Sequence, residues 1–160
     1  MVPVPPRSPV PTEALPNPSE AIVDTNHFVL QAIGVVRSPI RSRADAPCQG
    51  DEGGVDVWIE IADRVAAGLT GLKAGDELLI FTWLHVANRD VLQVHPRRKL
   101  DRPLIGVFAT RSPDRPNPIG LHRVSLLAIA GNRLRVAPME AIDGTPVVDI
   151  KPVLRTIVER

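Results

Sequence analysis

Residues 109–124, ATRSPDRPNPIGLHRV, combine three arginines with three prolines between two apolar runs. The prolines fix three backbone φ angles and restrict the residue before each, so the segment loses little conformational entropy when it holds a ligand. The arginines supply planar sets of N–H donors that suit a carboxylate or a phosphate. Asn117 can donate and accept, as a nucleobase edge requires, and Gly120 permits close approach of a ligand. The composition indicates a preorganised site for an anionic or nucleotide-like ligand, with a rigid loop of solvated arginines as the alternative.

Common motifs for other chemistries are absent. The sequence has no GxGxxG, P-loop, HExxH or paired-cysteine zinc pattern, so no metal site is expected. Cys48 is the only cysteine, which excludes an intrachain disulfide and fits a reducing compartment. With 19 basic and 18 acidic residues, the overall charge neither favours nor excludes a nucleic acid partner. No apolar run is long enough to span a membrane and no signal peptide is visible, so a cytoplasmic protein is predicted.

Short β-branched and apolar runs between turn residues predict the elements that position this loop. Strands are expected at 28–40, 55–61 and 104–110, and a hairpin at 123–138 with Ala-Gly-Asn at its turn. The run 76–86 is almost continuously apolar, which predicts a central strand buried on both faces. Pro146 and Pro152 interrupt the extended segment 145–154, which predicts an edge strand. With one or two helical turns in 62–72, the pattern indicates a mainly β barrel or sandwich with few short helices.

The first 26 residues differ from the rest of the chain. They are rich in proline and show no regular period, which predicts a disordered leader, with a ligand for a proline-recognition module as the alternative. Residues 27–160 are expected to form one folded domain.

Three segments together resemble one known family. The stretch GVFATRSPDRPNPIGLHRV at 106–124 resembles the signature of the TrmO family, also called TsaA-like or YaeB-like proteins. IGVVRSPI at 33–40 is similar to the family's opening strand, and AIDGTPVVDIKPVL at 141–154 is similar to its DGTP…DIKP segment. The resemblance implies a small β-barrel that binds S-adenosylmethionine and is unlike the Rossmann-type methyltransferases. It also implies a homodimer, with the cofactor near the subunit interface, that N6-methylates threonylcarbamoyladenosine at position 37 in the anticodon loop of tRNA.

The resemblance assigns the cofactor site residue by residue. The matched segments are the loop at 47–49, the end of the apolar run at 85–86, the arginine of ATR, a backbone contact after PNPIG, and the DGTP turn. The cofactor-binding residues expected from these matches are Pro47, Cys48, Gln49, His85, Val86, Arg111, Leu121, Ile142, Asp143, Gly144 and Thr145.

The chain departs from the family pattern at several places. Cys48 stands where the family commonly has arginine, and Val86 replaces a polar residue. The middle region is compressed, and the chain ends soon after DIKP, without the additional C-terminal domain that many bacterial members use to hold tRNA. The matched motifs therefore support the assignment of the cofactor more strongly than the assignment of the methyl acceptor.

Methyl transfer from a sulfonium is an in-line displacement, so the protein mainly positions the reactants and excludes water. The acceptor nitrogen is urea-like and a weak nucleophile, so its proton must be removed or shared. His85 and Asp143 are the candidate proton acceptors, and Asn117 is a third catalytic candidate. Two alternatives stay open: a hydrogen-bonded core histidine at His85, and a simple Asp-Gly turn at Asp143.

The segment 95–102, HPRRKLDR, is the densest basic cluster. It suits RNA phosphates, which give affinity and salt dependence but no sequence choice, or it is a solvated loop. The expected nucleic-acid contacts are Arg97, Arg98, Lys99 and Arg115.

Three functions remain open at this stage. They are a tRNA methyltransferase of the TrmO type, a methyltransferase with another RNA or a small molecule as acceptor, and a non-catalytic module that binds S-adenosylmethionine or RNA.

Overall fold

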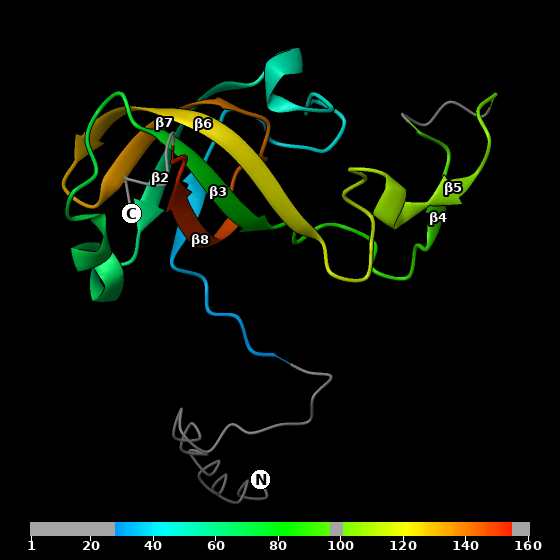
Figure 1. Cartoon of the computed structure of the whole chain (residues 1–160), viewed down its shortest axis with the longest axis horizontal. Helices are drawn as coiled ribbons and strands as arrows, with labels where there is room; N and C mark the ends of the chain where they lie inside the picture. Colours follow the sequence, from blue (N-terminus) through cyan, green and yellow to red (C-terminus); the bar gives the residue numbers. More distant parts are fainter. Residues whose placement is uncertain (1–27, 97–100, 155–160) are drawn as a thin grey trace, which may run out of the picture. The chain divides into compact units, whose positions relative to one another are not determined.

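The computed structural model describes residues 28–96 and 101–154 (Figure 1). The chain divides into two compact units, Met1–Leu30 and Gln31–Arg160, and every described strand belongs to the second. The predicted leader, 1–26, lies outside the described residues, as do Arg97, Arg98 and Lys99, so these expectations stay predictions.

The second unit is built on a closed barrel of six strands in which every neighbouring pair is antiparallel. Around the barrel the order is β1 (Gly34–Arg37), β2 (Val55–Ile61), β7 (Arg133–Met139), β6 (Ile119–Ala130), β3 (Glu77–Trp83) and β8 (Pro146–Pro152). A separate two-stranded sheet pairs β4 (Gln93–Val94) with β5 (Ile105–Gly106). The prediction of a mainly β-barrel fold is confirmed.

Helical structure is confined to short 3-10 segments in the described part of the chain. They include η1 (Gly50–Glu52), η2 (Asp63–Leu69) and η4 (Val107–Ala109). The helical turns predicted for 62–72 are η2. Within 28–96 and 101–154, no helix has the length and apolar character to cross a membrane.

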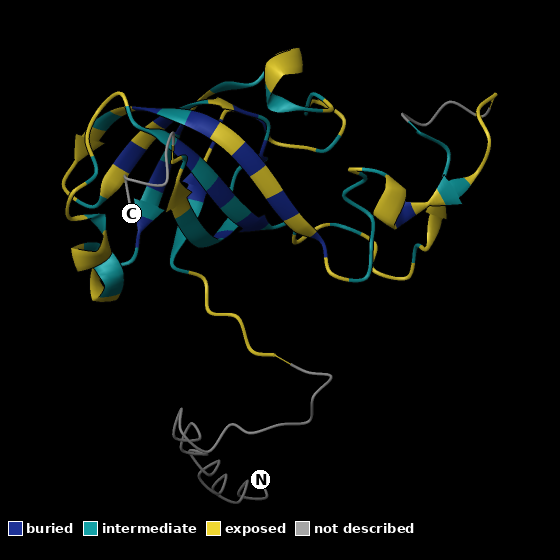
Figure 2. Ribbon diagram, viewed as in Figure 1, coloured by how far each residue is buried: buried dark blue, intermediate teal, exposed yellow. Residues whose placement is uncertain are grey.

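Alternation along the strands creates the core. Inward side chains are almost completely buried and outward ones are not, as the banded strands of Figure 2 show. The core inside the barrel includes Val36, Val57, Ile59, Leu78, Ile80, Val124, Leu126, Leu134, Val136 and Val147.

Two strands were predicted at the right place in the sequence, but the burial predicted for one and the edge position predicted for the other were wrong. The run 76–86 forms β3, but its burial alternates, because one face of a barrel strand points inward and the other outward. The last strand, β8, is not an edge: it pairs with β1 on one side and β3 on the other. Pro146 and Pro152 are the first and last residues of β8. A proline at a strand end removes few of the hydrogen bonds between neighbouring strands.

Of the other predicted strands, two are shorter in the structure than predicted, and the rest are confirmed. The predicted strand at 28–40 is regular only over β1, and 104–110 forms β5 followed by η4. The strand at 55–61 and the hairpin at 123–138 are confirmed as β2 and as β6 with β7.

Closure of an antiparallel barrel gathers particular strand ends at one rim. The ends of β1, β3 and β7 meet the starts of β2, β6 and β8 there, as the pairs Val55 with Met139 and Trp83 with Ile119 show. The connections at this rim are 38–54, 84–118 and 140–145. All predicted site residues in the described part of the chain lie in these connections or just beside them.

The alternation predicts a clear difference between two adjacent leucines of β6. Leu126 is fully buried, whereas Leu127 is 41% exposed. We expect Leu126→Ala to lower the free energy of unfolding by about 2–5 kcal/mol. Leu127→Ala serves as the matched control, with a loss of less than about 1 kcal/mol. Urea denaturation measures both, and equal losses would contradict the inward assignment of Leu126.

Candidate functional site

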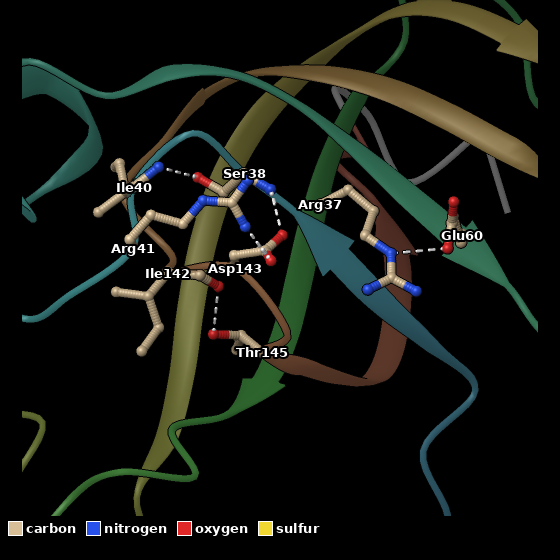
Figure 3. A network of polar contacts seen from close by, with 8 residues as sticks. All are labelled: Arg37, Ser38, Ile40, Arg41, Glu60, Ile142, Asp143 and Thr145. Carbon is tan, nitrogen blue, oxygen red and sulfur yellow. Dashed lines mark hydrogen bonds and ion pairs between the residues drawn. The ribbon is translucent and has the colours of Figure 1, made fainter.

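The Asp-Gly turn packs against the end of β1 (Figure 3). The carboxylate of Asp143 accepts the backbone N–H of Ser38 at 3.0 Å and forms an ion pair with Arg41. The backbone N–H of Asp143 donates to the Ile40 carbonyl at 2.8 Å, and that of Gly144 to Val36 at 2.9 Å. Gly144 has φ +78°, in the region that favours glycine. Asp143 therefore lies in an Asp-Gly turn, as the alternative interpretation from the sequence expected. A contact between Asp143 and the cofactor stays a prediction.

The connection 38–54, whose Ser38 and Arg41 contact Asp143, also reaches residues 109–118, called here the arginine–proline loop. Arg43 donates to Asp114 at 2.8 Å and to the Val86 carbonyl at 3.4 Å. The other oxygen of Asp114 accepts the backbone N–H of Asn88 at 2.8 Å. Two of the predicted segments, at 85–86 and 109–124, are thus joined to the 38–54 connection through Arg43 and Asp114. Neither residue of this pair was predicted as a site residue.

Arg115 is committed to its own loop. Its guanidinium donates to the carbonyl oxygens of Val107, Thr110 and Ser112 at 3.1, 2.6 and 2.8 Å. The charge is thereby used to hold the loop between η4 and β6 in shape. A phosphate contact by Arg115 stays a prediction.

Three other predicted residues meet at one cavity of about 180 Å³. Gln49, Arg111 and Leu121 line it, and Arg111 donates to the Leu121 carbonyl at 2.8 Å. The remaining lining residues are Gly50, Asp51, His122, Arg123, Pro138 and Glu140. A larger cavity of about 480 Å³ lies at the opposite rim, beside Glu60 and Arg133, and contains none of the predicted site residues.

His122 and Glu140 are the chemically distinctive residues of the smaller cavity, and the sequence analysis missed both. His122 Nδ1 lies 2.9 Å from Glu140 Oε1, and its Nε2 lies 2.9 Å from Thr82 Oγ1. The His122 side chain is 3% exposed and that of Glu140 is 20% exposed. A signal existed: on β6, His122 alternates with Val124 and Leu126 on the inward face, and a buried polar side chain requires a partner.

The charge of Glu140 is set by its neighbours. Burial raises the pKa of this carboxyl. The hydrogen bond from His122 and the electrostatic influence of His122 and Arg111 lower the pKa by more than burial raises it. The net result is a pKa below the ordinary value of 4.5. Glu140 is therefore ionised at neutral pH.

The remaining predicted residues sit in the rim connections. His85 is exposed in the turn after β3, so the alternative of a core histidine was wrong for this residue. Val86 is 48% exposed, Cys48 is exposed, and Asn117 is exposed in the arginine–proline loop. Among the residues with described placement, no group of His, Cys, Asp or Glu is arranged to hold a metal ion.

Comparison with known proteins identifies relatives over most of the chain. Residues 35–157 match the model of the tRNA-methyltransferase O N-terminal domain. A probable S-adenosyl-L-methionine-binding protein of Methanothermobacter thermautotrophicus is 46% identical over 123 residues, covering 77% of this chain and 88% of the relative. An S-adenosyl-L-methionine-binding protein of Archaeoglobus fulgidus is 43% identical over 124 residues, covering 78% of this chain and 88% of the relative.

Solved structures show the same fold. The crystal structure of TrmO from Pseudomonas aeruginosa superposes with a TM-score of 0.64 at 27% identity. The match covers 80% of this chain and 56% of that one. The chain thus spans little more than half the length of this solved relative, and the resemblance noted from the sequence is confirmed.

Gly120 provides a test of the buried His122 contact. A Cβ added there would lie 2.3 Å from Thr82 Oγ1 and 2.8 Å from His122 Nε2. We expect Gly120→Ala to lower the free energy of unfolding by about 1–3 kcal/mol, because the hydrogen-bonded pair occupies that space. Gly106→Ala is the control, since an added Cβ there meets no atom within 4 Å. Equal thermal denaturation midpoints for the two variants would contradict this packing.

Proposed function

The chain belongs to the tRNA-methyltransferase O N-terminal domain family, and we propose that it is an S-adenosylmethionine-dependent methyltransferase. The proposed reaction is N6-methylation of threonylcarbamoyladenosine at position 37 of tRNA. The observation that carries the proposal is the meeting, at one barrel rim, of the loops that match the family's motifs. Relatives of similar length are named as S-adenosylmethionine-binding proteins, which supports the choice of cofactor.

The cavity beside Arg111 fits part of such a cofactor. It measures about 180 Å³, whereas sites for whole small molecules occupy roughly 300–1,000 Å³. It offers a guanidinium and an ionised carboxylate, groups that suit the charged end of the molecule. In this proposal Gln49, Arg111 and Leu121 hold one part of the cofactor, and the turn at 142–145 holds another.

The sulfonium of the bound cofactor supplies an activated methyl group, so the chain's own task is positioning and proton removal. Both oxygens of Asp143 already accept hydrogen bonds, from Ser38 and Arg41. His85 lies exposed on the same rim, and a neutral imidazole nitrogen can accept a proton. We therefore assign the proton to His85, a positioning role to Asp143, and a contact with the base edge to Asn117.

A homodimer would complete the site. Beside the site rim, the outward face of β6 carries two partly exposed apolar side chains, Ile119 at 44% and Leu121 at 42% exposure. They pair across strands with Trp83 and Phe81 of β3, so an apolar surface lies at the site rim. We propose that a second copy covers this surface. It would bring further residues to a cavity that is too small for the whole cofactor.

The alternative in a different class is a module that binds S-adenosylmethionine without transferring its methyl group. The names of the relatives, which state binding only, favour keeping it. A third possibility retains the transfer but uses another RNA or a small molecule as acceptor.

Two measurements, methyl transfer and binding calorimetry, separate these functions. We expect transfer of labelled methyl from S-adenosylmethionine to tRNA that carries threonylcarbamoyladenosine, and none to matched tRNA that lacks it. Equal labelling of both tRNAs would point to another acceptor. If calorimetry detects binding of S-adenosylmethionine but no methyl group reaches either tRNA, the chain acts as a binding module.

Arg111 provides a test of the cofactor site. We expect Arg111→Ala to weaken S-adenosylmethionine binding at least tenfold, which corresponds to about 1.4 kcal/mol. Arg133→Ala is the matched control, because Arg133 lies at the opposite rim with its guanidinium 5.1 Å from the Trp58 ring centroid. Isothermal titration calorimetry measures both, and an unchanged affinity for Arg111→Ala would remove this residue from the site.

A further inference from the structure

The cavity beside Arg111 contains a carboxylate that the proposed function leaves without a role. Glu140 follows the end of β7 and lines this cavity together with Gly50 of η1 and Arg111 of the arginine–proline loop. It matches none of the motif residues that led to the cofactor site. Its environment nevertheless resembles that of a ligand-binding group more than that of a solvated surface carboxylate.

One oxygen of Glu140 is held by His122. Oε1 accepts from His122 Nδ1 at 2.9 Å. Oε2 faces the position of Gly50, where an added Cβ would lie 3.0 Å from it. Gly50 and Glu140 both line the cavity, and the absence of a side chain at Gly50 leaves room beside Oε2. An ionised carboxylate that is held in place and borders a cavity is suited to receive a cation.

His122 and Thr82 fix the position of the Glu140 carboxylate. His122, buried under the cavity, is held at its other nitrogen by the fully buried Thr82. Gly120 has no Cβ, which leaves the room that this His122–Thr82 contact occupies. The imidazole ring thus has little freedom to turn, and it fixes the carboxylate in turn. His122 acts as a positioning residue, since its contacts are with the protein.

The charged side chains of the cavity restrict which ligand it suits. Arg111, Arg123, Asp51 and Glu140 all line the same space of about 180 Å³. Arg123 is paired with Glu77 and Asp51 is exposed, so Arg111 and the partly buried Glu140 are the charges considered for a ligand. A phosphate would gain from the guanidinium but would be repelled by the carboxylate, and an uncharged nucleoside would use neither. A zwitterion with an ammonium and a carboxylate on one carbon matches both, and the small volume suits an amino-acid end rather than a whole nucleoside.

We propose that Glu140 receives the α-ammonium group of the amino-acid end of S-adenosylmethionine, while Arg111 faces its α-carboxylate. This inference rests on the proposed function and adds a specificity-determining residue to it. Glu140 makes the site select ligands that carry the amino-acid end over those that end at the thioether.

The first experiment compares two ligands by calorimetry. S-adenosylhomocysteine carries the amino-acid end, and 5′-methylthioadenosine lacks it. We expect Glu140→Gln to weaken binding of S-adenosylhomocysteine at least tenfold and to change binding of 5′-methylthioadenosine less than twofold. Glu60→Gln, at the opposite rim in an ion pair with Arg37, is the matched control and should change neither affinity.

Each other outcome has a defined meaning. An unchanged affinity of Glu140→Gln for S-adenosylhomocysteine overturns the inference, and so does an equal loss for both ligands, which would indicate a role in cavity shape. If the wild-type chain binds neither ligand, the proposed function itself fails. Binding of S-adenosylhomocysteine by wild type and Glu140→Gln alike would leave the proposed function standing and reject the inference alone.

A second measurement needs no stable variant of Glu140. An analogue of S-adenosylhomocysteine with hydrogen in place of the α-amino group should bind the wild-type chain at least tenfold more weakly than the parent. Equal affinities overturn the inference. His122→Gln should reduce this discrimination between parent and analogue, whereas a purely structural role would lower both affinities by the same factor.

Discussion

Closure of the barrel by the pairing of β8 with β1 is the constraint on which the site depends. With every pair antiparallel, a closed ring of six strands has two rims, and the topology assigns each connection to one of them. The connections 38–54, 84–118 and 140–145 all fall on the same rim. Segments separated by about a hundred residues in sequence, such as Ser38 and Asp143, therefore lie within hydrogen-bond distance. The register of strands, rather than any local preference of the loops, brings the site together.

Ion pairs then fix the connections to one another. Arg41 and Arg43, two residues apart, face in two directions: one pairs with Asp143 of the turn and the other with Asp114 of the arginine–proline loop. Partly exposed pairs of this kind add little to overall stability. Their value here is positional, because they hold a proline-restricted loop at a defined place on a rigid barrel. Preorganisation of this kind reduces the entropy lost when a ligand binds.

The arginines of residues 109–124 illustrate a division of labour. Arg115 donates to three backbone carbonyl oxygens, and Arg123 forms a two-pronged contact with Glu77 at 3.0 Å. Arg111 uses one nitrogen for the Leu121 carbonyl and lines the cavity. Composition alone presents the three arginines as equivalent. Their partners show that Arg115 holds its own loop, that Arg123 is paired with Glu77 while it also lines the cavity, and that Arg111 lines the cavity.

The sequence by itself determined the fold class and the family, because alternating apolar strands and three long ordered motifs are local patterns. It also identified Gln49, Arg111 and Leu121, which line one cavity. It could not show that 76–86 and 145–154 are barrel strands with two neighbours each, since closure is a property of the whole sheet. It also missed His122 and Glu140, eighteen residues apart, whose contact exists only because antiparallel β6 and β7 lie side by side. Only the tertiary structure decides which polar side chains become partners, because distance in space is set by strand register and not by spacing along the chain.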